Sequence, residues 1–146
     1  MSAVPVTPQM LESMAALERI VFPHPWSREA LTLLCGETAL AFACLEGEAV
    51  VAYGGMLTVL DEGQITNIVT HPAHRRRGHA AAVLTALLEE ARARELSFVT
   101  LEVRESNTPA IALYQKLGFR AVGRRPRFYT APVEDALIMQ CDLKGN

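Results

Sequence analysis

The chain has 146 residues, of which 50% are hydrophobic and 21% are charged, and its formal net charge at pH 7 is −2. This composition excludes a disordered or fibrous chain, and the length predicts a single globular domain over residues 1–146. Because the net charge is close to zero, a general attraction to nucleic acid or acidic membranes is also excluded, and any anion site must be local.

The predicted elements of the N-terminal half are a short strand, two helices and three strands, in that order. The first helix opens at Thr7 with Pro8 at its first position, and Ser27 caps a second helix that runs to about Leu34. The three strand-like segments are residues 38–46, 49–60 and 63–70. The pair Gly54-Gly55 predicts a bulge or a close backbone approach in the second of them. The apolar stripe of the first helix is predicted to consist of Met10, Met14, Leu17 and either Ile20 or Val21.

The C-terminal half predicts a long amphipathic helix, a strand, a short helix and two further strands. The long helix begins near Gly78, and the strand "SFVTLEVR" covers residues 97–104. Asn107 or Thr108 caps the short helix, which ends before Gly118. The last two strands are residues 119–125 and 134–143. Strands and helices mixed in this order predict an α/β fold, with helices on the faces of a mixed sheet. One face of the long helix is apolar and consists of Ala80, Val83, Leu84, Leu87, Leu88 and Ala91.

No apolar run approaches the ~18 residues that a membrane span needs, and the N-terminus lacks the charged and apolar regions of a signal peptide. We therefore expect a cytoplasmic protein with no membrane partner. The cysteines Cys35, Cys44 and Cys141 are widely spaced and lie in apolar surroundings, so they are expected to be buried free thiols.

Three arginines, Arg75, Arg76 and Arg77, stand directly before Gly78 at the predicted start of the long helix. A helix N-terminus presents unpaired N–H groups and a partial positive charge, and a glycine there lets an anion approach the backbone. Arginine side chains add bidentate hydrogen bonds to phosphate oxygens. The segment therefore predicts a phosphate site, although a solvated basic turn is an equally good interpretation on these grounds alone.

The same segment contains His71, His74 and His79, which raises the question of a metal site. The sequence offers these histidines no neighbouring acidic or cysteine partner of the kind found at zinc sites. The adjacent arginines would also repel a cation. No metal is therefore expected.

The segment Arg75–Ala80 resembles the Arg/Gln-x-x-Gly-x-Gly/Ala signature of the GNAT acetyltransferase superfamily. Four segments in the family's order, "PWS", "NIVTHPAHRRRGHA", "LEVRESNTPAIALYQKLGF" and "EDALIM", are similar to the ribosomal-protein-alanine N-acetyltransferases of the RimI type. Ala80 replaces the second glycine of the strict signature, and Arg75 stands where many relatives carry Gln. The resemblance implies the GNAT fold, a central mixed, mostly antiparallel sheet of six to seven strands flanked by about four helices and splayed at the cofactor site.

The resemblance also implies that the chain binds acetyl-CoA. The loop amides would hold the pyrophosphate, the strand before the loop would pair with the pantetheine arm, and the Val69 N–H would donate to the thioester oxygen. The residues implied in cofactor binding are Ile68, Val69, Thr70, Arg75, Arg76, Arg77, Gly78, His79, Ala80, Ala81 and Asn107.

Two residues are expected to carry the chemistry, because acyl transfer to an amine requires removal of a proton and stabilisation of the leaving thiolate. The resemblance places the general base at Glu102 and the general acid at Tyr114. An apolar sheet environment at Glu102 would raise its pKa toward neutrality, whereas the alternative is a structural ion pair with Arg104 or Arg120. Tyr114 is a core tyrosine if it has no catalytic role.

The expected activity is transfer of acetyl to a protein N-terminus, with the N-terminal alanine of a small-subunit ribosomal protein as the implied acceptor. An α-amine, with a pKa of ~8, is deprotonated more easily at neutral pH than a lysine with a pKa of ~10.4, so it needs a weaker general base. Phe128-Tyr129 resemble an aromatic pair that shapes the family's peptide slot, and Glu134-Asp135 either neutralise a cationic acceptor or are ordinary hairpin charges.

Three other functions remain open on the sequence alone. One is a GNAT enzyme that acetylates a small amine or a lysine, and another is a catalytically silent sensor. The third is an RNA-binding module that uses Arg75–Arg77 with Arg124, Arg125 and Arg127, against which the near-neutral charge counts. No DNA partner is expected.

Overall fold

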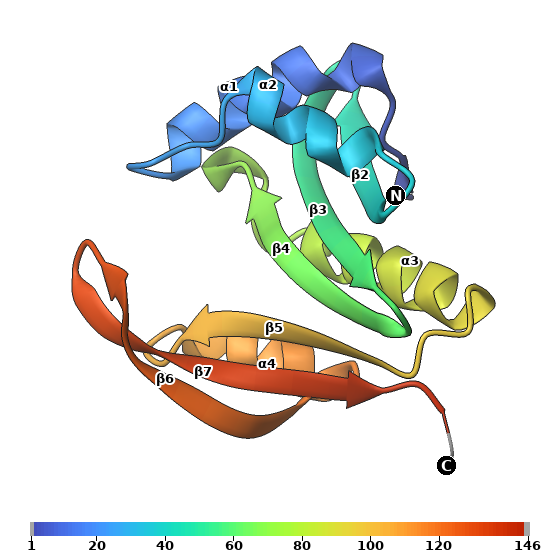
Figure 1. Ribbon diagram of the computed structural model, residues 1–146. Coiled ribbons are helices and arrows are strands. Elements are labelled where there is room, and N and C mark those ends of the chain that lie inside the picture. The colour runs from blue at the N-terminus through green and yellow to red at the C-terminus, as the bar shows by residue number, and fades with distance from the viewer. Residues whose placement is uncertain (1, 145–146) are drawn as a thin grey trace.

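Seven strands form one sheet in the order β1-β2-β3-β4-β5-β7-β6 in the computed structural model, which describes residues 2–144 (Figure 1). Neighbouring strands are antiparallel except for β4 and β5, which are parallel. The strands are β1 (Val4–Pro5), β2 (Ala39–Glu46), β3 (Ala49–Val59), β4 (Glu62–Thr70), β5 (Phe98–Arg104), β6 (Arg120–Thr130) and β7 (Val133–Asp142). The predicted mixed, mostly antiparallel sheet is confirmed.

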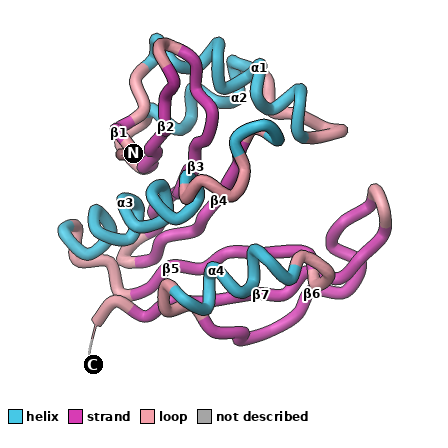
Figure 2. Tube along the Cα trace, turned by 180° about the vertical axis from the view of Figure 1, so that it is seen from behind, coloured by secondary structure: helices cyan, strands magenta, loops and turns pink. Residues whose placement is uncertain are grey.

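The helices cover the two faces of the sheet unequally. Helices α3 (His79–Ala93) and α4 (Thr108–Lys116) lie on one face, as Figure 2 shows, whereas α1 (Leu11–Val21) and α2 (Arg28–Leu31) cover only the β2–β4 side of the other face. Short 3-10 helices precede α1 (Pro8–Met10), follow α2 (Thr32–Cys35) and follow β4 (Pro72–His74). Each face has its own hydrophobic cluster, one built around α3 and the other around α1.

The sheet opens in its middle, because β4 and β5 pair only over Glu62–Gln64 and Phe98–Thr100. Beyond these residues the two strands diverge (Figure 1). The pairing shifts between Gly55 and Met56, and the extra residue, Thr66, lies in β4, so the bulge is opposite the Gly54-Gly55 pair and not in its own strand. Gly54 is also required by packing, since a Cβ there would lie 2.6 Å from Cγ1 of Val83 on α3. The predicted splay of the sheet is confirmed.

The cysteines are free thiols. Cys44 and Cys141 are buried as expected, whereas Cys35 is exposed, so the expected burial is wrong for Cys35.

Most predicted helix signals are confirmed, and so is the apolar stripe of the first helix, with Val21 as its last member. Ser27 caps α2 by accepting a hydrogen bond from the Ala30 N–H at 3.1 Å. Ile20, the other alternative for the stripe, is 57% exposed, and Glu18 is an unexpected buried residue of the same helix. Within residues 2–144, no helix combines the length and the apolar character needed to cross a membrane.

Candidate active site

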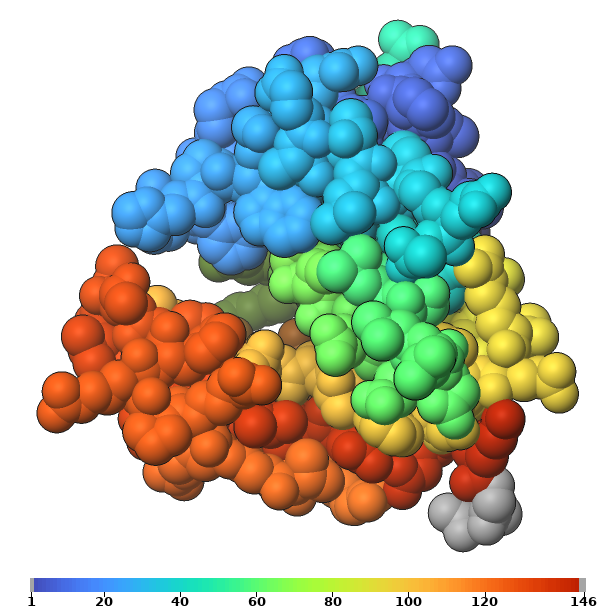
Figure 3. All heavy atoms as spheres, in the orientation of Figure 1, coloured from blue at the N-terminus to red at the C-terminus, as the bar shows by residue number. Residues whose placement is uncertain are grey.

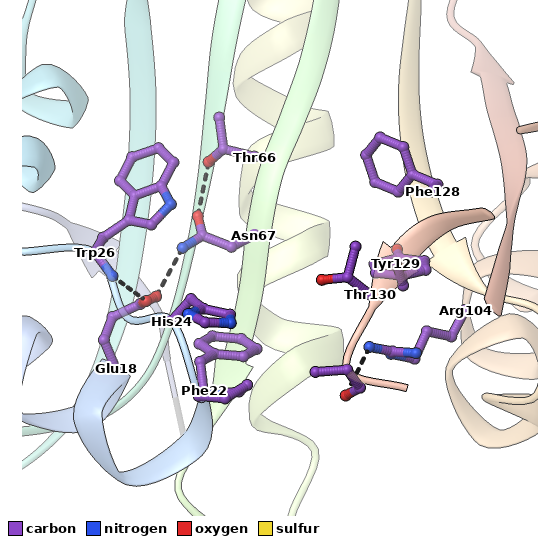
Figure 4. Close-up of a pocket in the computed structure, with 12 residues that line it drawn as sticks. Glu18, Phe22, His24, Trp26, Thr66, Asn67, Arg104, Phe128, Tyr129 and Thr130 are labelled. Carbon is purple, nitrogen blue, oxygen red and sulfur yellow. Dashed lines mark hydrogen bonds between the residues drawn. The ribbon is translucent and has the colours of Figure 1, made fainter. Parts of the chain in front are cut away.

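Two adjoining cavities open where β4 and β5 separate. The first, here called the hairpin cavity, has a volume of about 310 Å³ and lies between the α1–α2 connection and the β6–β7 hairpin. Its aromatic walls are Phe22 and Trp26 on one side and Phe128 and Tyr129 on the other (Figure 4). In the space-filling view of Figure 3 the surface is hollowed between these two parts of the chain.

The second cavity, here called the sheet cavity, has a volume of about 490 Å³ and lies over β4 and β5. Glu102 and Arg125 line it, and Trp26 and Thr66 line both cavities. A group that enters through the hairpin cavity therefore comes to the neighbourhood of Glu102.

One wall of the hairpin cavity is held by Glu18, which is only 1% exposed. Its carboxylate accepts hydrogen bonds from the Trp26 N–H and from Nδ2 of Asn67, both at 2.9 Å, and from the Tyr53 hydroxyl. Asn67 also donates to the Tyr53 oxygen at 2.7 Å. Burial, followed by the hydrogen bond to Glu18, raises the pKa of Tyr53. These bonds tie α1 to β4 and to the connection after α1, as Figure 4 shows, and through Tyr53 they also tie α1 to β3.

The Glu18 network was not predicted. The signal that could have found it is the position of a carboxylate four residues after Met14, on the apolar stripe of the first helix. A buried carboxylate is costly unless it is hydrogen-bonded, so a charged residue on such a stripe indicates a polar network inside the fold.

The opposite wall is formed by the β6–β7 hairpin and the end of β5. The Arg104 guanidinium lies 4.4 Å from the ring centre of Tyr129 and 3.2 Å from Oε1 of Glu134. The Ser106 N–H donates to Glu134 at 2.6 Å. Hydrogen bonding by the Ser106 side chain and then by its backbone, followed by Arg104, lowers the pKa of Glu134. Because Glu134 already has these partners, its contacts favour the interpretation as a hairpin charge.

Glu102 lies on the β5 face that lines the sheet cavity, as the strand alternation predicted. Its Oε2 is 2.6 Å from Nε of Arg125 on β6, and its side chain keeps 31% of its exposure. The apolar environment expected for Glu102 is therefore wrong. An ion pair does form, but with Arg125, because Arg104 and Arg120 pair instead with Glu134 and Asp142.

Tyr114 lies on α4 and is 8% exposed, with its ring centre 5.9 Å from that of Phe119. Burial, with a smaller contribution from Tyr129, raises the pKa of Tyr114 to about 12. The phenol therefore keeps its proton at neutral pH. Burial, followed by the charge of Glu102, also raises the pKa of Tyr129.

The predicted anion loop lies at the start of α3, where Gly78 is the N-cap with φ 81°. This left-handed conformation favours glycine. The first hydrogen bond of the helix runs from the Ala82 N–H to the Gly78 oxygen at 3.0 Å. The N–H groups of His79, Ala80 and Ala81 precede it and are available to an anion. Asn107 caps α4 by accepting from the Ala110 N–H at 3.3 Å.

The amides of β4 do not all face the gap. The His71 N–H donates to the Val51 oxygen on β3 at 2.8 Å. In an antiparallel pair every second residue of a strand hydrogen-bonds to the same neighbour, so Val69 bonds to β3 as His71 does. In this register Val69 pairs with Tyr53, so its N–H points toward β3. The N–H groups of Ile68 and Thr70 face the gap instead, so the expectation that the Val69 N–H donates to the thioester oxygen is wrong.

Comparisons with known proteins agree with this geometry. A family model described as the acetyltransferase (GNAT) family matches residues 11–119. The chain belongs to this family, and the predicted GNAT fold is confirmed. It is therefore an acetyltransferase that uses acetyl-CoA as the acyl donor. The loop at Gly78 and the gap beside β4 fit this cosubstrate, because they offer free amides to its phosphates and to its extended arm.

The chain is similar to proteins described as [ribosomal protein bS18]-alanine N-acetyltransferases. The protein from Haemophilus ducreyi is 33% identical over 137 residues, covering 92% of this chain and 94% of the relative. The protein from Escherichia coli strain K12 is 36% identical over 125 residues, or 84% of each chain. A crystal structure of the ribosomal-protein-S18-alanine N-acetyltransferase from Escherichia coli has a TM-score of 0.90 at 31% identity, covering 99% of this chain and 95% of that one.

Proposed function

We propose that the chain acetylates the N-terminal alanine of the ribosomal protein bS18 in its own cell. The observation that carries this proposal is the aromatic-walled hairpin cavity, which adjoins the cavity that Glu102 lines and suits an extended chain end better than a compact amine. The relatives described above act on this substrate according to their names, and they align over 84% or more of both chains.

Acetyl-CoA supplies the activated acetyl group when bound. The amides at the start of α3 bind its pyrophosphate, with Arg75 and Arg76 as charged neighbours. The N–H groups of Ile68 and Thr70 orient its extended arm along β4, and one of them hydrogen-bonds the thioester oxygen. Asn107, at the start of α4, adds a polar contact.

Glu102 accepts the proton of the acceptor amine, directly or through a water. In the free protein the Glu102 carboxylate is paired with Arg125. The Arg125 side chain is 60% exposed, so it can turn into solvent when the amine binds. Tyr114 donates its phenol hydrogen to the departing sulfur. With its pKa raised to about 12, the phenol first acts as a hydrogen-bond donor, because a thiol near pKa 8.5 does not by itself remove that proton.

The proposal is tested with peptides that carry the first residues of bS18 from the same organism. The free peptide, the same peptide with a blocked α-amine and an internal lysine, and a series with altered first residues are incubated with acetyl-CoA. Mass spectrometry should find acetyl only on the free α-amine, with alanine preferred at the first position. Equal acetylation of the blocked peptide would show a lysine acetyltransferase, and turnover of small amines alone would show a different acceptor class.

A further inference from the structure

Three side chains from separate parts of the chain meet beside the anion loop. Glu46 ends β2 at the β2–β3 turn, His74 ends the 3-10 helix after β4, and His79 begins α3. One ligand atom from each lies within 4.8 Å of the other two. The fold thus supplies the acidic partner that the local sequence around the histidines lacks, and the premise that these histidines have no such partner is wrong.

His79 is the unusual member of this group. It is 6% exposed, and within residues 2–144 neither of its ring nitrogens has a hydrogen-bond partner. A neutral imidazole carries one N–H and one lone pair, so burial leaves both groups unsatisfied. Buried polar groups are almost always paired in proteins, and an unpaired one calls for a missing partner. A metal ion bound through the lone pair would supply that partner.

The ligand set indicates which ion would bind. Two imidazoles and one carboxylate are the protein ligands of many zinc sites that keep a fourth position for water. Nδ1 of His74 is already 3.2 Å from Oε2 of Glu46, which is close to the spacing of about 3.3 Å between two ligands on tetrahedral zinc. The Glu46 and His74 side chains are 53% and 20% exposed, so they can move the remaining distance toward the fixed His79.

The positively charged guanidinium of Arg77 contacts two of the three side chains of this cluster. Its Nη1 lies 3.2 Å from Nδ1 of His74 and 3.5 Å from Oε2 of Glu46. The guanidinium is 53% exposed and can turn into solvent or toward a phosphate. His71 is not one of the residues whose ligand atoms lie together here, and its Nδ1 accepts a hydrogen bond from the Ala73 N–H at 3.0 Å.

The geometry points to a divalent transition-metal site, suited to zinc, formed by Glu46, His74 and His79. The ion joins the β2–β3 turn to the first residue of α3, and it competes with Arg77 for Glu46 and His74. This site is independent of the proposed acceptor and of the catalytic residues.

Zinc chloride alone is titrated into the metal-free full chain by calorimetry, and cobalt(II) is used to read the coordination geometry from its visible absorption. We expect one ion per chain and tetrahedral cobalt bands. Glu46→Gln and His79→Gln should each weaken zinc binding at least tenfold, whereas the controls Glu48→Gln, on the same turn, and His24→Gln should not. If His79→Gln fails to fold, the exposed Glu46 still provides the test.

A last variant separates this site from adventitious binding of zinc at the surface. Arg77→Gln removes the competing charge, so zinc should bind several-fold more tightly. An affinity that is unchanged or weaker in this variant would overturn the proposal. So would the absence of saturable binding at one ion per chain, or equal losses in Glu46→Gln and Glu48→Gln.

Discussion

The two halves of the sheet, β1–β4 and β5–β7, hold their polar groups in opposite ways. In the first half, the Glu18 carboxylate is buried and accepts from three donors, on Trp26, Tyr53 and Asn67. In the second half, Glu102 keeps contact with solvent and is held by an ion pair with an exposed arginine. A buried network fixes the shape of a wall, whereas an exposed ion pair can be exchanged for a substrate without leaving an orphaned group. Substitutions in the first half should therefore change stability and KM, and those in the second half should change kcat.

The largest effect is expected at Glu102. Glu102→Gln keeps the shape of the side chain and removes its basicity, so kcat should fall on the order of 10²–10⁴-fold if proton removal limits the rate. The melting temperature should change little, because the side chain is partly exposed. Steady-state kinetics across pH check this, with Glu105→Gln as the control, since Glu105 forms a similar exposed pair with Arg124. A Gln variant with the wild-type rate and pH profile would return Glu102 to a structural role.

The opposite result is expected at Glu18, on the buried side of the comparison. Glu18→Ala leaves the donors on Trp26, Tyr53 and Asn67 without their acceptor, so the free energy of unfolding should fall by about 1–3 kcal/mol. Urea denaturation measures the loss. The matched control is Glu12→Ala on the same helix, because Glu12 is 74% exposed and forms an exposed ion pair with Arg28. Equal losses in the two variants would contradict a stabilising role for the network.

Gly78, in the loop that follows β4, should affect the binding of acetyl-CoA more than stability. Gly78→Val fills the anion loop and strains a residue at φ 81°, so the KM for acetyl-CoA should rise tenfold or more with kcat less affected. Gly118→Val is the control, since Gly118 also has a positive φ, of 104°, and lies beyond the C-terminal end of α4. It should cost stability alone. Unchanged acetyl-CoA affinity in a folded Gly78 variant would remove the loop from the binding site.

Tyr114 gives the smallest effect of the set. Tyr114→Phe deletes only the hydroxyl, and kcat should drop about tenfold while acetyl-CoA binding stays the same. A thioester with a better leaving group should reduce the difference. If the variant turns over normally, the acid role fails.

The raised pKa of Tyr114 also gives a pH signature. Because the folded pKa of about 12 lies above the unfolded value of ~10, this group stabilises the fold fully below pH 10, and that contribution is lost as the pH rises toward 12. Tyr114→Phe should remove this part of the alkaline loss of stability, which denaturation at pH 9 and 11 would measure. An identical loss in both proteins would contradict the buried, protonated phenol.

Local patterns predicted the elements, because capping residues, glycines and alternation act over a few positions. Ser27 and Asn107 cap their helices as expected, and the Gly54-Gly55 pair lies opposite the bulge in β4. The partners of charged groups depend on the whole topology and were not predicted. Glu102 meets Arg125 only because β6 lies beyond β7. Glu46 meets His74 only because the β2–β3 turn lies beside the loop after β4.

The topology also bears on the alternative of RNA binding. Arg124 pairs with Glu105 and Asp135, and Arg125 pairs with Glu102, so the charges of these two arginines are locally neutralised. A basic surface of the kind that binds phosphate backbones depends on arginines whose charge is available to the ligand. This arrangement counts against that alternative.

The alternation of amides along the free edge of β4 has a consequence for solvent exchange. The Val69 N–H is shielded by its bond to β3, whereas those of Ile68 and Thr70 meet no strand across the gap. In deuterated water, the free protein should exchange these three neighbouring amides in a fast, slow, fast order. A bound acyl donor that pairs with the edge should slow the two fast positions and leave the middle one unchanged. Three adjacent backbone hydrogens thus report the cosubstrate's direction and register without any substitution in the chain.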